Sequence, residues 1–256
     1  MNRILEKYRN GQPSVGTFTH MRSPVAVEAL GTAGLDYVIL DTEHCVQNPE
    51  TLADCITAAD AAGLDAVVRI NAISREAVLR PLDLGAKGLI VPAVETVEEV
   101  ERLVRFAKFP PLGNRGFCPT RDGLWGFDDA SQAGSEVYMD RCNRQTLLIP
   151  QCETAGCLAH IEQIAATEGV DGIFVGPLDL SIALGCPMEL DSPRMRAALE
   201  RVVAACKAAG KLTMIFCGDT AAAKARLAAG FDSAALGLDV LTLIQSYRAM
   251  AKEVRG

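Results

Sequence analysis

Several kinds of residue are scarce in this sequence of 256 residues, and each scarcity excludes a class of protein. Only three histidines and one tryptophan are present. Lysine and arginine number 25 against 32 acidic residues, which gives a formal net charge of -7. Nucleic acids and anionic membranes bind clustered basic residues, so we expect neither as a partner. The negative net charge does not exclude small anionic substrates, because one arginine or a bound metal can outweigh it locally.

Long hydrophobic runs and paired cysteines are also missing. No apolar stretch approaches the length that spans a bilayer, and the start MNRILEKYRNGQ lacks the apolar core of a signal peptide. The nine cysteines occur singly, without a CxxC pair, which is typical of reduced thiols in a cytoplasmic protein. With so few histidines, a zinc site built from Cys and His is not expected either.

What the sequence does contain is an alternation of two patterns. Amphipathic, alanine-rich stretches, several of which begin with a capping residue and end in glycine, predict helices. Short apolar runs between them predict eight buried strands, at 14–20, 37–41, 66–70, 88–94, 146–153, 172–177, 211–216 and 233–239. This alternation predicts an α/β fold, a single (β/α)8 TIM barrel over residues 1–256. A doubly wound open sheet is the alternative, but no glycine-rich dinucleotide fingerprint follows the first strand.

One region breaks the alternation. Residues 110–144 form a long, glycine-rich and polar stretch that contains the only tryptophan, Trp125. Loops of this length inside a compact domain are usually functional or take part in assembly. The mixture of aromatic and arginine residues favours an ordered segment over a disordered insertion.

Polar residues follow several of the predicted strands. In a (β/α)8 barrel the active site lies at the C-terminal ends of the strands, so these side chains are expected to converge. They are Asp41, Glu43, His44, Arg69, Asn71, Gln151, Glu153, Asp179 and Ser181. Helix capping is the alternative for Asp41, and an ordinary position on a surface loop is the alternative for His44. Arg69 is harder to explain in that way, because it interrupts an apolar run and a buried charge needs a partner or a ligand.

Two of these residues, Glu153 and Asp179, are carboxylates without a neighbouring Cys or His cluster. Oxygen ligands of this kind suit Mg²⁺ or Mn²⁺ held jointly with substrate and water, whereas helix caps or a pair that binds arginine are the alternatives. Lys87 and Lys211 lie at the starts of strands, and no lysine ends one, so a Schiff-base aldolase is disfavoured. Stabilisation of an enolate by a metal is then the favoured chemistry.

Six motifs together resemble the metal-dependent class II pyruvate aldolases of the HpcH/HpaI aldolase/citrate lyase family. The motifs are GLDYVILDTEHC, VVRI, LDLGAKGLIVPAVETVEE, FPPLGNRG, PQCET and EGVDGIFVGPLDLSIALG, and they cover nearly the whole chain. The resemblance implies a (β/α)8 barrel of the phosphoenolpyruvate/pyruvate-binding type. It also implies a homo-oligomer, typically a hexamer built as a dimer of trimers, in which the last helix packs on a neighbouring subunit.

Position by position, the resemblance implies a role for most of the polar residues. Glu153 and Asp179 match the ligands of a divalent metal, Mg²⁺ or Mn²⁺ with Co²⁺ as a further candidate. Arg69 matches the arginine that binds pyruvate. His44 matches the region of the catalytic base, and Asp41 matches the acid beside it.

The remaining matches concern the acid at Asp83 and the pocket that receives the substrate. Asp83 matches an acid that in relatives supports the histidine from a neighbouring subunit. The implied substrate-binding positions are Arg69, Gln151, Gly176, Pro177, Leu178 and Asp179. Backbone N–H groups after Pro177 would hold the substrate carboxylate at a helix N-terminus.

The implied reaction is the reversible cleavage of a 4-hydroxy-2-oxo acid into pyruvate and an aldehyde. Arg69 and the metal would stabilise the enolate that forms when the bond between C3 and C4 breaks. His44, through a water, would take the proton of the C4 hydroxyl, with Asp41 fixing its orientation. Leu178 and Leu238 depart from many relatives, as does the segment RGFCPTRDGLWG, so the particular 2-oxo acid and aldehyde stay open.

Three other functions compete with this interpretation. A CoA-ester lyase of the citrate lyase β type would need a basic surface for the nucleotide, and the chain is short and acidic for that role. A phosphate-binding barrel such as a sugar-phosphate epimerase should have glycine-rich loops after the last two strands, where CGDT and GLDV are weak matches. A non-catalytic barrel would not need Arg69, Glu153 and Asp179 to converge.

Overall fold

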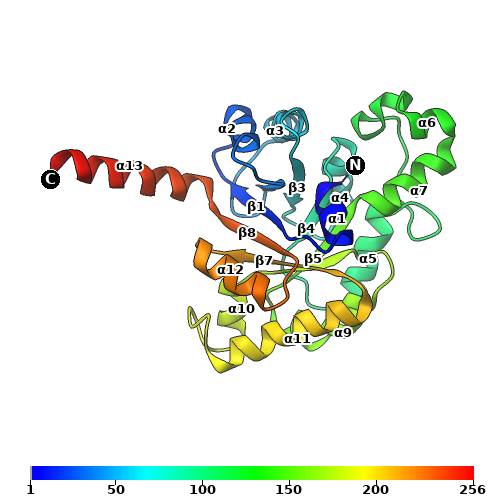
Figure 1. Ribbon diagram of the computed structural model, residues 1–256. Coiled ribbons are helices and arrows are strands. Elements are labelled where there is room, and N and C mark those ends of the chain that lie inside the picture. Colours follow the sequence, from blue (N-terminus) through cyan, green and yellow to red (C-terminus); the bar gives the residue numbers. More distant parts are fainter. Residues whose placement is uncertain (1) are drawn as a thin grey trace.

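The computed structural model describes residues 2–256, and its eight strands form a closed parallel barrel (Figure 1). Neighbouring strands pair in chain order, and the last pairs back with the first. The strands are β1 (Ser14–Thr19), β2 (Tyr37–Asp41), β3 (Asp65–Arg69), β4 (Gly88–Val91), β5 (Leu147–Cys152), β6 (Gly172–Val175), β7 (Leu212–Cys217) and β8 (Ser233–Leu238). The predicted (β/α)8 barrel is therefore confirmed, and the predicted strands differ from the observed ones only at their ends.

Helices alternate with these strands around the outside of the barrel (Figure 1). Several begin at residues whose side chains accept a backbone N–H of the first turn; Thr96 and Glu99 form a full capping box. The helices of the ring and the N-terminal helix are α1 (Arg3–Arg9), α2 (Pro24–Gly31), α3 (Pro49–Ala61), α4 (Arg75–Asp83), α5 (Val97–Ala107), α8 (Ala155–Ala159), α9 (Ile161–Ala166), α10 (Pro177–Ala183), α11 (Pro193–Ala209) and α12 (Thr220–Ala228).

The segment predicted as a long loop at 110–144 contains helical turns of its own. These are η1 (Arg121–Gly126), α6 (Asp129–Ala133) and α7 (Ser135–Gln145). Phe109, Phe117 and Tyr138 pack edge to face, with ring centroids 5.7–6.3 Å apart, and join the segment to the barrel. Trp125 remains exposed on η1.

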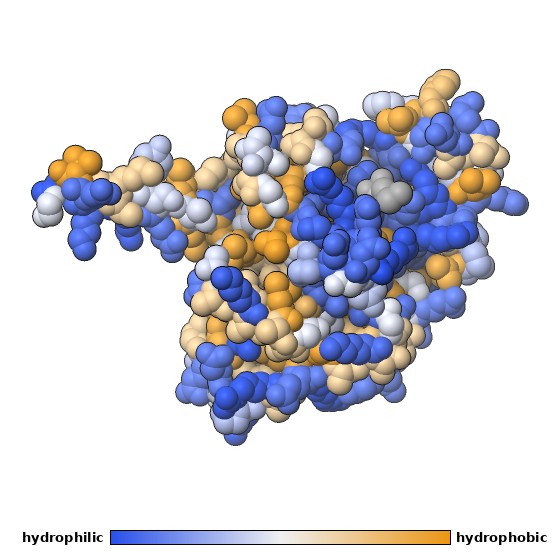
Figure 2. Space-filling model, viewed as in Figure 1, coloured by the Kyte–Doolittle hydropathy of each residue, from blue (hydrophilic) through white to orange (hydrophobic). Residues whose placement is uncertain are grey.

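The last helix, α13 (Asp239–Arg255), leaves the barrel and extends away from it (Figure 1). Large apolar side chains are exposed along it, and Figure 2 shows hydrophobic surface on this projecting helix. They are Leu241, Leu243, Ile244, Tyr247, Met250 and Val254. Among residues 2–256 no helix combines the length and apolar character needed to cross a membrane.

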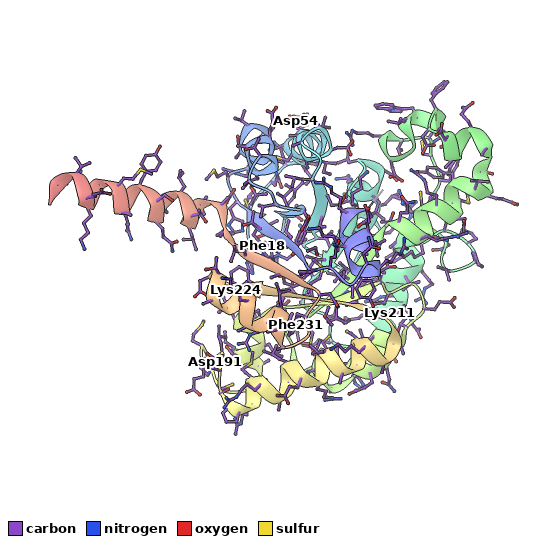
Figure 3. All side chains as sticks on the ribbon, viewed as in Figure 1. Phe18, Asp54, Asp191, Lys211, Lys224 and Phe231 are labelled. Atoms are coloured by element: carbon purple, nitrogen blue, oxygen red, sulfur yellow. The ribbon has the colours of Figure 1, made fainter. Side chains whose placement is uncertain are left out.

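The core consists of two apolar layers, because successive side chains of a strand point to opposite faces. In β2, Val38 and Leu40 pack outward against the helices, whereas Tyr37 and Ile39 fill the barrel interior. Figure 3 shows Phe18 among the strands, whereas Asp54, Asp191 and Lys224 lie on the outside.

Helix α1 closes the end of the barrel where the strands begin. Ile4 and Leu5 belong to the interior apolar cluster, and the backbone N–H of Ile4 donates to Asp65 Oδ2 at 3.0 Å. The apolar side chains of α1 therefore plug this end of the barrel.

Candidate active site

The candidate site lies at the C-terminal ends of the strands. Along each strand, alternate side chains point into the barrel, and this series of inward-facing side chains is called its inward row. In β2 the inward row Tyr37, Ile39 continues to Asp41, and in β3 the row continues from Val67 to Arg69. The pairing of β2 with β3 sets Asp41 directly opposite Arg69. The two charges that interrupt apolar runs in the sequence therefore meet above the apolar interior.

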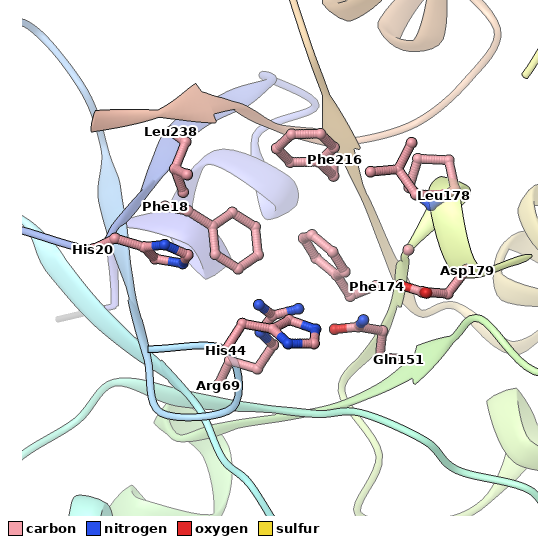
Figure 4. Close-up of a pocket in the computed structure, with 12 residues that line it drawn as sticks. Phe18, His20, His44, Arg69, Gln151, Phe174, Leu178, Asp179, Phe216 and Leu238 are labelled. Atoms are coloured by element: carbon pink, nitrogen blue, oxygen red, sulfur yellow. The ribbon is translucent and has the colours of Figure 1, made fainter. Parts of the chain in front are cut away.

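A cavity of about 200 Å³ opens at this end of the barrel (Figure 4). Its walls are of two kinds. The polar side chains are His20, His44, Arg69, Gln151 and Asp179. The large apolar side chains are Phe18, Phe174, Leu178, Phe216 and Leu238. A pocket with a few polar groups in an otherwise apolar wall is typical of a small-molecule site.

Arg69 is buried and held by two carboxylates. Its Nε and Nη2 donate to Asp41 Oδ1 and Oδ2 at 2.9 and 2.7 Å, and Nη1 lies 3.2 Å from Glu43 Oε2. Its guanidinium also lies over the Phe18 ring, 4.8 Å from the centroid. A guanidinium has five N–H groups, so these contacts leave donors on Nη1 and Nη2 for a ligand carboxylate or keto oxygen.

Asp41 is fully buried and stays ionised for a clear reason. Burial opposes its negative charge, but the hydrogen bonds and charge of Arg69 outweigh burial and hold the pKa of Asp41 below its ordinary value. The backbone N–H of Glu43 and the ring of His20 contribute further hydrogen bonds. Asp41 therefore links Arg69, the loop after β2 and a histidine that follows β1.

The structure differs from the sequence-based interpretation of His44. Asp41 accepts the backbone N–H of His44 at 3.4 Å, but the His44 ring lies beside Glu43 instead, with Nε2 3.7 Å from Oε2. The ring stands on the cavity rim and is 63% exposed. Asp41 makes no hydrogen bond to this ring among the described residues; its oxygens accept from Arg69, His20 and the backbone N–H groups of Glu43 and His44.

His20 is the functional candidate that sequence reasoning missed. Its Nε2 lies 2.7 Å from Asp41 Oδ2, and its ring lines the cavity. The alternation of side chains along β1 could have identified it. Phe18 faces the barrel interior, so His20, two residues later, is the next inward-facing position. The same alternation from Met214 identifies Phe216 at the end of β7.

Glu153 lies at the end of β5 in a largely buried position. Its Oε1 accepts the backbone N–H of Ala93 at 2.7 Å, and its Oε2 accepts from the amide of Gln151. Burial raises the pKa of Glu153, and the nearby charge of Asp179 raises it further, although both hydrogen bonds oppose the shift. Glu153 is buried whereas Asp179 is exposed at the start of α10, and a cation held between them would relieve the repulsion of their charges.

Gly176 gives these groups room. A Cβ at this position would lie 2.8 Å from Glu153 Oε2 and 2.9 Å from Gln151 Nε2. Pro177 then starts α10, and Leu178 and Asp179 of its first turn line the cavity together with Gly176. The absence of a side chain at Gly176 lets the end of β6 lie close to Glu153 and Gln151 at the end of β5.

The donor set fits a hard divalent cation. Within residues 2–256 no group of three or more His, Cys, Asp or Glu side chains is arranged to enclose a metal by itself. Glu153 and Asp179 would supply two carboxylate oxygens, and Gln151 Oε1 is buried without a hydrogen-bond partner in this part of the chain. Mg²⁺ and Mn²⁺ accept such partial sets, because water and substrate complete their coordination.

Three other candidate residues do not reach the cavity. Asp83 at the end of α4 pairs with the buried Arg115, 3.0 Å from its Nη2, and lines a separate groove with Arg121 and Trp125. Ser181 donates to the backbone oxygen of Leu178 and accepts from Met188, so it holds a turn. Asn71 is exposed after β3.

Comparisons with known proteins show which family the chain is similar to. The model of the HpcH/HpaI aldolase/citrate lyase family matches residues 14–246. The chain is 34% identical to a hydroxypyruvate/pyruvate aldolase of Paraburkholderia phytofirmans, covering 99% of this chain and 98% of that one. It is 30% identical to a 2-keto-3-deoxy-L-rhamnonate aldolase of Salmonella gallinarum, with 99% and 94% covered.

A solved structure from Burkholderia cenocepacia J2315, described as an HpcH/HpaI aldolase/citrate lyase family protein, has the same fold. It is 35% identical, covers the whole of both chains, and superposes with a TM-score of 0.91. The family model matches most of the sequence, and the solved structure has the same barrel. The chain belongs to the HpcH/HpaI aldolase/citrate lyase family of enzymes.

Proposed function

We propose that this protein is a divalent-metal-dependent aldolase that cleaves a 4-hydroxy-2-oxo acid into pyruvate and an aldehyde, reversibly. The observation that carries the proposal is one cavity that joins a braced arginine, Arg69, to Asp179 and the neighbouring Glu153. The family includes enzymes whose names specify pyruvate and 2-oxo acid cleavage, which supports this class of substrate.

Arg69 would bind and stabilise the reacting 2-oxo acid. Breaking the C3–C4 bond leaves negative charge on the C2 oxygen of the pyruvate enolate, and a guanidinium fixed beside that oxygen stabilises this charge. Asp41 and Glu43 hold Arg69 before substrate arrives, so little reorganisation is needed in the reaction. The N–H groups at the start of α10, after Pro177, would help to hold the substrate carboxylate.

Glu153 and Asp179 would hold Mg²⁺ or Mn²⁺, with Co²⁺ as a further candidate, and Gln151 would contribute to the substrate side. Bound there, the cation would supply positive charge that polarises the keto group. The burial of Glu153 and the nearby charge of Asp179 support a shared cation as their partner.

His44 is the proposed base for the proton of the C4 hydroxyl. Its ring lines the cavity and is open to water, so a water can connect it with the substrate. The His44 ring lies beside Glu43 and not beside Asp41, and we propose that Asp83 of a neighbouring copy also helps to orient it.

We propose that the protein assembles through α13, as a hexamer built from trimers. In a (β/α)8 barrel the helix after the last strand ordinarily covers the outside of the barrel. Here α13 projects outward, and a groove of about 750 Å³ lies against α2, lined by Ala26, Leu30 and Leu236. Residues at the start of α13, such as Leu243, also line this groove, and the exposed apolar face of α13 from another copy would suit its apolar part.

A cytoplasmic location is part of the proposal. All nine cysteines lie within residues 2–256 and are unpaired there, which supports it.

The test is pyruvate release from a panel of 4-hydroxy-2-oxo acids, measured after chelation and again with Mg²⁺ or Mn²⁺ restored. We expect metal-dependent turnover in the wild type and a loss of at least about 100-fold in Glu153→Ala, since a ligand is removed. Glu162→Ala is the matched control, because Glu162 pairs with Arg201 on the surface.

Full activity in chelator, or full metal-dependent activity in Glu153→Ala, would show that the proposed metal site is wrong. Cleavage of acyl-CoA esters in place of 4-hydroxy-2-oxo acids would favour the citrate lyase type of chemistry instead. Glu162→Ala should match the wild type in every arm of the assay.

A further inference from the structure

We propose that His20 is a specificity-determining residue that hydrogen-bonds a hydroxyl group on the aldehyde half of the substrate. This inference rests on the proposed aldolase function and adds a residue and a substrate preference to it. The substrate class it defines is short hydroxyaldehydes, as acceptors in synthesis or as products of cleavage.

The position of His20 in the cavity is the first observation. Figure 4 shows His20 and Asp179 on opposite sides of the cavity, with the apolar rings between and above them. Asp179, Glu153 and Arg69 would engage the carboxylate and keto group of the 2-oxo acid. The aldehyde half must then extend away from Asp179, toward the side that His20 occupies.

The loop that carries His20 is held firmly in place. Asp239 accepts from the backbone N–H of His20 at 2.9 Å, from Met21 at 3.2 Å and from the Thr19 hydroxyl at 2.6 Å. The ring itself is fixed by Asp41, 2.7 Å from Nε2. A ring fixed at both its backbone and one nitrogen loses little entropy when it binds a ligand.

The second ring nitrogen of His20 is available for a ligand. Nε2 is engaged with Asp41, and the tautomer that donates the Nε2 proton to this carboxylate leaves Nδ1 as an acceptor. The hydrogen bonds of residues 2–256 include none to Nδ1. An acceptor of this kind suits an alcohol O–H.

Few polar side chains near His20 could bind the same hydroxyl group of the substrate. Phe18, Phe216 and Leu238 form the wall around it and offer no polar side-chain atom. His44 is the other polar side chain on the rim, and the proposed mechanism already employs it at the C4 hydroxyl. A hydroxyl further along the aldehyde would therefore depend on His20, because an unpaired polar group in an apolar wall is costly.

The experiment uses pyruvate with two aldehydes of nearly equal size, glycolaldehyde and propanal, which differ in one hydroxyl. The readout is the ratio of kcat/KM for glycolaldehyde to kcat/KM for propanal in the metal-loaded enzyme. We expect the wild type to favour glycolaldehyde and His20→Leu to lower this ratio roughly ten-fold, the effect of one lost hydrogen bond. His20→Gln, which keeps a polar group, should restore part of the ratio.

Oxaloacetate decarboxylation separates this proposal from the proposed function. Its C3–C4 bond breaks to release carbon dioxide, the electron pair forms the same enolate, and C3 then takes a proton, so no aldehyde is involved. The wild type should decarboxylate oxaloacetate, which tests the enolate chemistry by itself. Any loss that His20→Leu causes through Asp41 and Arg69 should lower kcat/KM for both aldehydes alike and cancel in their ratio. The matched control, His160→Leu, alters an exposed histidine outside the cavity and should change neither readout.

Each outcome of these assays either supports or overturns the proposed role of His20. Equal losses with both aldehydes in His20→Leu, or an unchanged ratio, would overturn the role of His20 while leaving the aldolase function intact. A wild type that neither adds pyruvate to aldehydes nor decarboxylates oxaloacetate would overturn the proposed function and this inference with it.

Discussion

At the scale of single residues, the buried arginine of the candidate site has an oppositely charged partner. Arg69 lies inside an apolar strand, and Asp41 on the neighbouring strand neutralises it with two hydrogen bonds. Removing one partner of a buried pair costs about 3–5 kcal/mol, because the other charge is stranded. The pair of Arg69 and Asp41 therefore positions the arginine of the candidate site and also stabilises the rim of the barrel.

Asp65 at the start of β3 gives a prediction at the same scale. Burial raises the pKa of Asp65 from 3.8 to about 6, although the backbone N–H of Ile4 opposes the shift. The folded protein thus holds this proton more tightly than the unfolded chain. The resulting stabilisation is complete below pH 3.8 and is lost as the pH rises through 6, a change of about 3 kcal/mol.

We expect Asp65→Asn to remove this component. Urea unfolding followed by far-UV circular dichroism, at a series of pH values from about 3.5 to 7 and one protein concentration, measures it. The difference in free energy of unfolding between the wild type and Asp65→Asn should change by about 3 kcal/mol across that range. Parallel pH curves for the two proteins would contradict the assignment.

At the scale of elements, the strand ends bring distant residues together. Each inward row alternates with an outward row, so the side chain two residues beyond an interior apolar residue enters the mouth of the barrel. This relation connects Ile39 to Asp41, Phe18 to His20 and Ile149 to Gln151. The candidate site is a ring of such positions, one strand after another.

The end of β6 supplies a prediction at this scale. Gly176→Ala would bring a methyl group within 2.8 Å of Glu153 Oε2 and 2.9 Å of Gln151 Nε2. Gly176 has a φ of -92°, which alanine also adopts, so the effect is a local displacement of the acid. We expect kcat/KM for 4-hydroxy-2-oxo acid cleavage to fall at least about ten-fold, since small misplacements of catalytic groups are costly.

Thermal unfolding is the companion measurement for Gly176→Ala. A melting temperature close to that of the wild type, together with lost activity, would localise the effect to Glu153 and Gln151. Wild-type activity would contradict the close approach of β6 to these side chains.

At the scale of the whole molecule, the projecting α13 is the feature that a lone barrel does not explain. Its exposed apolar side chains would favour association in water, and the groove beside α2 offers a matching surface. The same contact would link assembly to the active site, because Asp239 both begins α13 and holds the loop of His20.

Replacing two apolar residues of α13 with charges tests this. We expect Ile244→Glu with Met250→Glu to convert the oligomer to smaller species, measured by size-exclusion chromatography with light scattering. Cleavage activity should fall with assembly if a neighbouring copy supplies Asp83. Lys252→Glu, a charged change on the same helix, is the control; an unchanged mass for the double variant would contradict assembly through α13.

The sequence by itself determined the barrel, because local periodicity and apolar runs are properties of neighbouring residues. It also marked Arg69, Glu153 and Asp179, since a charge at the end of a buried strand needs a partner or a ligand. It did not determine which histidine meets Asp41. That choice depends on the register between strands and on side-chain packing across the mouth, where His20 reaches Asp41 and the His44 ring turns to Glu43. Only the tertiary structure decided it, because the contacts join residues that no local pattern relates.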